Sequence, residues 1–142
     1  MANCVSTSPR LLLAETNSDE ALFFRRMFEQ VARHWQVVWE KDGKAAVRRV
    51  LNQGFPDLLV TRIDLPQRSG LDLIEWIRSL QSPKAIPVLI YDTTPNATQR
   101  QQLSGWGVED YLDKHSPPEK VKLVLRQLVI QIEKQAVLAG KE

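Results

Sequence analysis

An arginine and an aspartate stand two positions apart at the end of a short apolar run in the middle of the chain. The stretch DLLVTRIDLPQRSG spans residues 57–70, with Arg62 where the apolar run ends and Asp64 two residues later. Open α/β sheets gather their ligands and reacting groups at the carboxyl ends of their strands. A carboxylate in such a place can accept a transferred group or bind a cation, whereas an arginine is a permanent cation without a nucleophile. The two residues therefore predict different chemistry for the same place.

Motifs of the common nucleotide-binding and hydrolytic enzymes do not occur in the sequence. There is no GxGxxG, no GxxxxGK followed by Ser or Thr, and no GxSxG turn that would expose a nucleophilic serine. His34 and His115 are far apart, and no set of His, Cys, Asp and Glu has the spacing of metal ligands. We therefore predict that the chain is not an enzyme.

Composition and charge indicate an ordinary globular protein. The 142 residues include 43% hydrophobic and 25% charged residues, and 19 basic against 17 acidic residues give a net charge of +2. The basic residues are scattered, so we expect no nucleic-acid binding. No apolar run is long enough for a signal peptide or a membrane span. Cys4 is the only cysteine, which excludes a disulfide framework and, with the other features, predicts a cytoplasmic protein.

Five apolar runs alternate with five segments of helical spacing. The runs are at residues 11–15, 35–39, 57–61, 86–91 and 109–112, and the helical segments at residues 17–34, 42–54, 71–80, 94–103 and 116–138. Apolar strands that alternate with helices indicate a parallel sheet covered on both faces. We therefore predict one doubly wound α/β domain of five βα units at residues 10–138. A disordered tail at residues 1–9 and a short tail at residues 139–142 flank it.

Capping residues predict where several helices begin or end. Ser69, with Asp72 three residues on, is typical of a capping box and begins the third helix. Thr94 and Pro95 are a cap and a first-turn proline, and they predict the start of the fourth helix. Gly54 ends the second helix.

Three separated motifs follow one another in the chain: LLLAETNSDEA, a strand leading into an xxLPxxSG loop, and GVEDYLDKHSPPE. Together with the five βα units, they resemble the receiver domain of bacterial response regulators over residues 10–136. The resemblance implies a flavodoxin-like, CheY-like fold with strand order 2-1-3-4-5. It also implies a place in two-component or phosphorelay signalling, where a receiver takes a phosphoryl group from a histidine kinase onto one aspartate.

The resemblance assigns the phosphoacceptor position to Arg62. In the family the acceptor stands four residues before the loop proline, which is Pro66 here. Counting forward from the Pro56–Asp57 pair, which the family shares, gives the same position. Because arginine lacks the carboxylate nucleophile, the resemblance describes a degenerate pseudo-receiver.

The other functional positions of the family are only partly kept. The acid pair after the first strand aligns with Glu15 and Thr16, and the Thr or Ser after the fourth strand aligns with Asp92. Lys114 is kept, and so is the aromatic switch residue, Tyr111. The proline that follows the lysine in the family is His115, so we expect a trans bond where the family has a cis bond. The Mg²⁺ that bridges the carboxylates and the phosphoryl group in the family is expected to be lost.

Four hypotheses remain open for this group of residues. In the first, Arg62 replaces the metal ion and forms salt bridges with Glu15 and Asp92, so that two acids face two cations, Arg62 and Lys114. In the second, the site has decayed and Arg62 reaches into solvent. In the third, Asp64 is a displaced acceptor. In the fourth, Arg62 and Lys114 hold a small anion in a flavodoxin-like binding protein.

The resemblance implies that the chain is a stand-alone atypical response regulator that works by protein-protein interaction. Its partners would be a histidine kinase or a downstream effector, bound through the face of the fourth helix, fifth strand and fifth helix. Trp35 and Trp39 lie on the expected edge strand, one predicted in the core and one partly exposed. A homodimer is a further possibility, supported by apolar residues outside the core stripe of the last helix: Leu123, Ile130, Val137 and Leu138.

Overall fold

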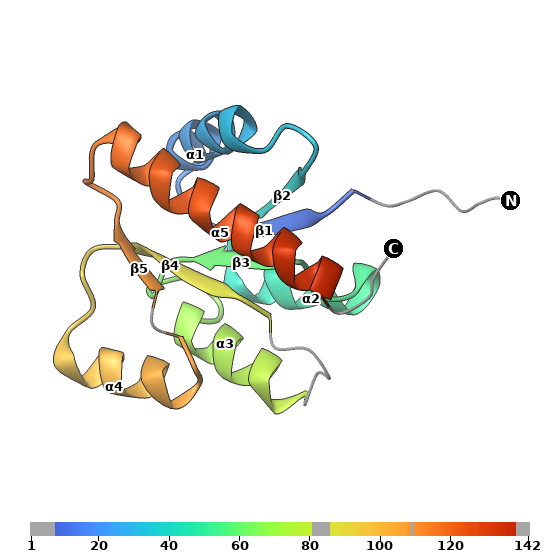
Figure 1. Cartoon of the computed structure of the whole chain (residues 1–142). Helices are drawn as coiled ribbons and strands as arrows, with labels where there is room; N and C mark the ends of the chain where they lie inside the picture. The colour runs from blue at the N-terminus through green and yellow to red at the C-terminus, as the bar shows by residue number, and fades with distance from the viewer. Residues whose placement is uncertain (1–7, 81–85, 109, 139–142) are drawn as a thin grey trace, which may run out of the picture.

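The computed structural model describes residues 8–80, 86–108 and 110–138. Within them, five strands form one central sheet and five helices cover its two faces (Figure 1). The tails predicted at residues 1–9 and 139–142 lie outside the described residues, apart from Ser8 and Pro9.

Strands and helices alternate along the chain. In chain order the elements are β1 (Arg10–Ala14), α1 (Ser18–Val31), β2 (Gln36–Glu40), α2 (Gly43–Gln53), β3 (Leu58–Thr61), α3 (Gly70–Ser79), β4 (Val88–Asp92), α4 (Ala97–Gly105), β5 (Asp110–Asp113) and α5 (Pro118–Leu138). These are the five βα units that the apolar runs predict.

All strand pairs are parallel, and the sheet order is β2-β1-β3-β4-β5. The predicted α/β fold with order 2-1-3-4-5 is therefore confirmed. The chain winds one way from β1 to β2 and the other way from β3 onward. Such a reversal opens a crevice at the carboxyl ends of the strands on either side of it, here β1 and β3.

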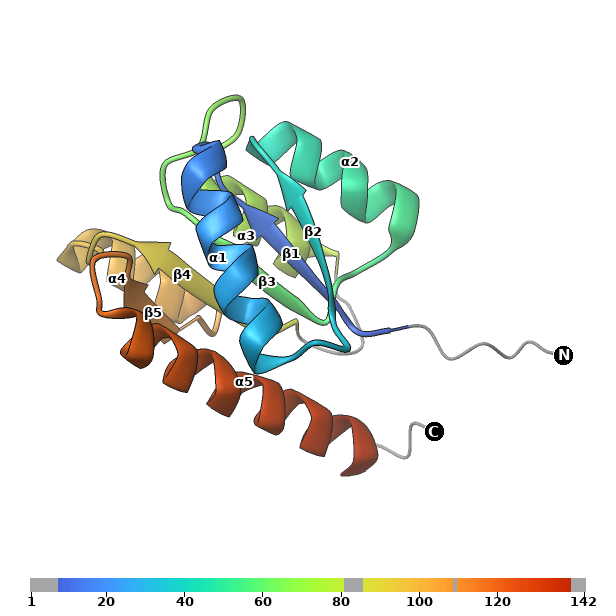
Figure 2. The ribbon, with the colours of Figure 1, turned by 90° about the horizontal axis from the view of Figure 1, so that it is seen from above.

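Each face of the sheet has its own hydrophobic core. Leu11 and Leu13 pack with Phe28 on the face that α1 and α5 cover, and Leu12 packs with Ile74 on the opposite face. Successive strand residues point to opposite faces, so a strand covered on both sides needs apolar residues at every position. Figure 2 shows α1 and α5 side by side over one of these faces.

The fourth helix begins later than the sequence predicts. It starts at Ala97 with Asn96 as its cap, whose side chain accepts from the Gln99 backbone N–H at 2.8 Å. The Gln99 side chain accepts in return from the Asn96 N–H at 3.0 Å. This reciprocal pair satisfies two backbone donors at once, so the helix starts at Asn96 in place of the Thr94–Pro95 pair. Ser69 caps α3, and Gly54 follows α2 in the left-handed region, as predicted.

The two tryptophans of the second strand region behave as predicted for an edge strand. Trp35 is buried and meets the Phe28 ring edge-on, whereas Trp39 is 38% exposed. The indole N–H of Trp35 donates to the Glu133 carboxylate on α5 at 3.0 Å, and His34 forms a close contact with the same carboxylate. This cluster fastens the second half of α5 to the turn between α1 and β2.

The Glu133 cluster predicts a pH-dependent contribution to stability. Burial raises the pKa of Glu133, but the hydrogen bonds to His34 and Trp35 and the charge of His34 outweigh it and hold the pKa below its ordinary 4.5. A carboxylate with a depressed pKa in the fold contributes stability above its unfolded pKa and loses it as pH falls through the folded value. Glu133→Gln is therefore expected to cost about 0.5–1 kcal/mol at pH 7, because the group is partly solvated.

Urea denaturation of the native chain and Glu133→Gln at about pH 7 and about pH 3 measures this difference. The difference between the two free energies of unfolding should become smaller at the acid pH, because the carboxylate takes up a proton as the pH falls through its folded pKa. A cost that is equal at both pH values would show that the contribution of Glu133 does not depend on its charge.

Two glycines let the loop between β3 and α3 approach its neighbours closely. A Cβ added at Gly70 would lie 1.8 Å from the carbonyl oxygen of Arg62, and one added at Gly43 would lie 1.9 Å from that of Arg68. The Gly70 N–H donates to the Ile63 carbonyl at 2.8 Å. The backbone at Arg62 can therefore lie this close to α3 only because Gly70 has no side chain.

Gly70→Ala is expected to lower the free energy of unfolding by about 1–3 kcal/mol, because the new Cβ forces the backbone at Arg62 to shift. Gly105→Ala in α4 is the matched control, since nothing lies within 4 Å of the added Cβ. This control is expected to leave stability unchanged or raise it by up to about 1 kcal/mol, because alanine favours helix. Equal effects of the two changes in urea denaturation would contradict the close approach.

Candidate functional site

The carboxyl ends of three neighbouring strands bring Glu15, Arg62 and Asp92 together. Glu15 follows β1, Arg62 follows β3, and Asp92 is the last residue of β4. Ala14 is level with Thr61 across the β1–β3 pair, and the Arg62 N–H donates to the Ala14 carbonyl at 3.3 Å. Parallel strands end at one edge of the sheet, so the side chains that follow them meet there.

Arg62 lies between two buried carboxylates. Its Nη1 is 3.3 Å from Glu15 Oε2, and its Nε is 3.7 Å from Asp92 Oδ2. Glu15 is 1% exposed and Asp92 is 6% exposed, whereas the Arg62 side chain is 21% exposed. The structure thus contains both ion pairs of the salt-bridge hypothesis, and the guanidinium reaches solvent only in part.

The two ion pairs differ in kind. Arg62 donates a hydrogen bond to Glu15. Its buried Nε has no hydrogen-bond partner among the described residues, so Arg62 and Asp92 form an ion pair without a hydrogen bond. Asp92 is held instead by the backbone, since it accepts from the Ile63 N–H at 3.0 Å and from the Thr93 N–H at 2.7 Å. Asp92 is therefore fixed by the two loops beside it.

The carboxylates keep Arg62 charged despite its burial. Burial lowers the pKa of Arg62, but the charges of Glu15 and Asp92 and the hydrogen bond to Glu15 outweigh it, so the pKa is raised above its ordinary value. The site therefore holds a fixed positive charge at every pH at which the fold persists.

Lys114 pairs with an acid that the sequence reasoning missed. Its Nζ lies 3.4 Å from Glu20 Oε1 on α1, and its backbone N–H donates to the Asp92 carbonyl at 3.1 Å. Three carboxylates therefore face two cations, and the predicted balance of two against two is wrong. Glu20 lies five residues after Glu15, and the only sequence signal was its place in the first turn of α1.

The remaining predicted site residues lie around this cluster. Thr16 and Asp64 are exposed, and Asp64 lies in the loop two residues beyond Arg62. Tyr111 is half-buried on the α3 and α4 side of the sheet, and its hydroxyl donates to the Val108 carbonyl at 3.3 Å. All peptide bonds of the described residues are trans, including the one that joins Lys114 to His115, as predicted.

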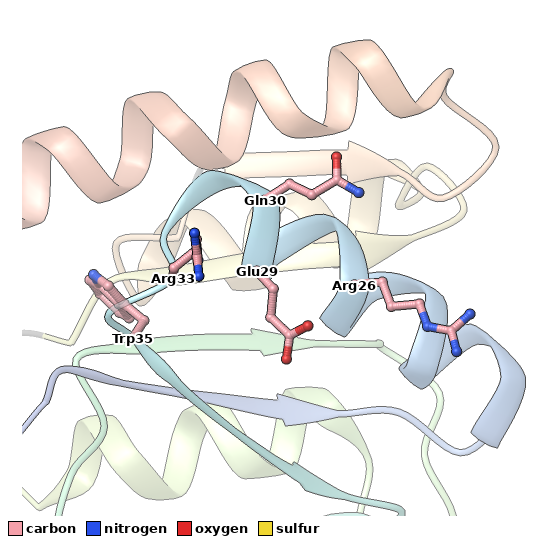
Figure 3. Close-up of a pocket in the computed structure, with 5 residues that line it drawn as sticks. All are labelled: Arg26, Glu29, Gln30, Arg33 and Trp35. Carbon is pink, nitrogen blue, oxygen red and sulfur yellow. The ribbon is translucent and has the colours of Figure 1, made fainter.

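A surface hollow of about 510 Å³ lies on α1 and the turn that follows it, and not at the strand ends. Its lining residues are Arg26, Glu29, Gln30, Arg33 and Trp35 (Figure 3). The side chains of Glu29 and Gln30 point in different directions from α1 in this view, and Lys122 of α5 donates to the Gln30 side-chain oxygen at 3.0 Å. The polar groups of this hollow diverge, unlike those of a typical ligand site.

Comparison with known proteins shows the family. Residues 11–126 match the model of the response regulator receiver domain. The chain belongs to this family. It is 28% identical over 124 residues to the sensor histidine kinase TmoS of Ectopseudomonas mendocina, a match that covers 87% of this chain and 12% of TmoS. It is 34% identical over 92 residues to the response regulator protein PmrA of Pseudomonas aeruginosa, covering 65% of this chain and 40% of PmrA.

The chain thus spans only part of the length of these two relatives. Among solved structures, it resembles the signal receiver domain of a signal transduction histidine kinase from Syntrophus aciditrophicus, with a TM-score of 0.73 and 19% identity. That likeness covers 87% of this chain and 92% of the other, and it supports the fold.

Membership of the receiver family places the chain in two-component signalling, where receiver domains interact with histidine kinases and effectors. Receiver domains are in general signalling modules and not enzymes. No helix within the described residues has the length and apolar character to cross a membrane.

Proposed function

We propose that this receiver is a pseudo-receiver, which acts by protein-protein interaction and accepts no phosphoryl group. The observation that carries the proposal is the Arg62 guanidinium between the buried carboxylates of Glu15 and Asp92. Arg62 follows β3 at the level where the family resemblance expects the acceptor aspartate. A guanidinium offers neither the nucleophile nor the metal ligand that this chemistry needs.

Loss of Mg²⁺ binding is part of the same proposal. Mg²⁺ takes near-octahedral oxygen ligands and prefers carboxylates with water and phosphate oxygens. At the carboxyl ends of β1, β3 and β4, the described residues offer the carboxylates of Glu15 and Asp92, both in contact with Arg62, and the family's second acid position is occupied by the exposed Thr16. This donor set does not fit the ion, since Arg62 already supplies positive charge between the carboxylates.

The hypotheses of a displaced acceptor at Asp64 and of a bound small anion receive less support. Asp64 is exposed in the loop, two residues beyond the strand-end position of Arg62. Arg62 and Lys114 each have a carboxylate partner, Glu15 and Glu20 respectively, so neither offers a free charge to a small anion.

We further propose that the chain presents one fixed state to its partner, a histidine kinase or downstream effector, through the face of α4, β5 and α5. Asp92 stands at the position of the family's Thr or Ser after the fourth strand, and its carboxylate accepts hydrogen bonds from two backbone N–H groups. The Tyr111 hydroxyl is held by the Val108 carbonyl. A homodimer through α5 is a secondary possibility, favoured by exposed Leu123, Ile130 and Val137 at seven-residue spacing.

Incubation with acetyl phosphate and Mg²⁺, followed by intact-mass measurement, tests the proposal. The native chain is expected to show no added phosphoryl group, because Arg62 lacks a nucleophile. An adduct that disappears in Asp64→Asn would instead establish the displaced acceptor. An adduct that persists in Asp64→Asn would place phosphorylation on another residue and would equally end the proposal.

A further inference from the structure

The free edge of β2 lies beside a hollow that the proposed function does not use. Among the described strands, β2 pairs with β1 alone and forms one edge of the sheet (Figure 2). The hollow, of about 240 Å³, lies between α1 and β2, and its lining residues are Ser18, Ala21, Leu22, Arg25, Val37 and Trp39. Pockets for small-molecule ligands measure about 300–1,000 Å³, so this hollow is better suited to one bulky side chain. We call it, together with the β2 edge, the β2-edge groove.

Val37 and Trp39 direct their backbone groups away from the sheet. The Gln36 N–H donates to the Pro9 carbonyl at 2.8 Å, and the Glu40 carbonyl accepts from the Glu15 N–H at 3.1 Å. Residues 36, 38 and 40 therefore face β1, and in a parallel ladder the residues between them face outward. Such an edge is a template to which an extended peptide can add as a further strand.

Apolar surface lies next to this edge and is partly open to solvent. Leu22 is 44% exposed and Trp39 is 38% exposed, above the buried Val37. The indole N–H of Trp39 donates to the Glu15 carbonyl at 2.6 Å, so this wall of the groove is held in place. A preformed apolar wall lowers the ordering cost of binding and suits an anchoring side chain.

Arg25 gives the groove a charge preference. Its Nη2 donates to the outward carbonyl of Val37 at 3.2 Å. Within the described part of the chain, its guanidinium makes no ion pair with a carboxylate. A permanent cation at the rim of an apolar hollow favours a carboxylate on whatever fills the hollow.

We propose that the β2-edge groove binds an extended segment of a partner protein that carries a bulky apolar side chain and a carboxylate two positions away. Residues two apart in a strand point to the same face, so the apolar side chain enters the hollow while the carboxylate meets Arg25. An extended segment can pair with the outward N–H of Val37 and with the outward N–H and carbonyl of Trp39. A helical segment cannot, because its own backbone groups are paired within the helix, so an extended segment is favoured. The proposal does not depend on the role of Arg62.

The probe is a capped pentapeptide, Thr-Phe-Val-Asp-Thr, with a charge-reversed form that has Lys in place of Asp. Titration into the full ¹⁵N-labelled chain is followed by NMR. The acidic peptide is expected to slow hydrogen exchange of the Val37 and Trp39 amides by about tenfold or more, because they become strand donors. Arg25→Glu should bind the acidic peptide about tenfold more weakly and the lysine peptide about tenfold more tightly.

Two further variants complete the design. Arg33→Glu alters an exposed arginine beyond the groove and should leave both affinities unchanged. Leu22→Glu places a charge at the hollow and should abolish binding while the rest of the spectrum stays native. The proposal is overturned if neither peptide binds at millimolar concentration or if Val37 and Trp39 stay unprotected at saturation. Equal weakening of both peptides by Arg25→Glu would also overturn it.

Discussion

Arg62→Ala is expected to lower the free energy of unfolding by about 3–4 kcal/mol at neutral pH, near the lower end of the cost of breaking a buried ion pair. The change leaves Glu15 and Asp92 buried without the cation that they share. The 21% exposure of the Arg62 side chain keeps the cost below the upper limit, because solvent already screens part of the interaction. Urea denaturation followed by circular dichroism measures the difference.

A neutral replacement of the whole cluster separates the charge effect from packing. The triple variant Glu15→Gln, Arg62→Met, Asp92→Asn removes all three charges and should cost about 1–2 kcal/mol, less than Arg62→Ala, because no buried charge is left unpaired. The remaining cost arises because an asparagine amide can accept only one of the two backbone N–H bonds that Asp92 accepts. Arg48→Ala, at an exposed position on α2, is the control and should cost less than about 0.5 kcal/mol. If Arg62→Ala is as mild as Arg48→Ala, the guanidinium contributes no buried pairing and the cluster has simply decayed.

Phosphorylation is expected to return only when three positions are changed together. The variant Thr16→Asp, Arg62→Asp, Asp92→Thr has the acid pair, acceptor and hydroxyl that the family resemblance requires, and Lys114 is already present. This triple variant should take one phosphoryl group from acetyl phosphate when Mg²⁺ is present. Its stability should also rise with Mg²⁺, because an ion that binds only the folded state stabilises it.

Arg62→Asp alone is the matched comparison and should remain unphosphorylated. It places a third carboxylate beside Glu15 and Asp92 without a cation between them, and like charges at close range disfavour one another. Asp92 would also repel an incoming phosphoryl group. Intact mass with and without Mg²⁺ tests both variants. Equal phosphorylation of the single and triple variants would show that Asp92 and Thr16 do not block the site.

The fold and the position of Arg62 followed from patterns that act over short stretches of chain. Apolar runs and helical spacing identify strands and helices because each reflects the repeat of one element. Pro56 precedes β3 and Pro66 follows it, and the family resemblance, counted from these two prolines, assigns Arg62 to the acceptor position at the strand end. The start of α4 was misjudged because two caps competed within three residues, and the Asn96–Gln99 pair satisfies more backbone donors than Thr94.

The sequence by itself thus determined the order of the elements, the parallel sheet and the residues that stand at its carboxyl edge. The tertiary structure alone decided which of these residues touch. Lys114 turns to Glu20 on α1, Asp92 is held by backbone N–H groups, and α1 leaves a hollow along β2. The physical reason is that side-chain pairing between elements depends on loop paths and rotamers, which no periodicity along the chain encodes.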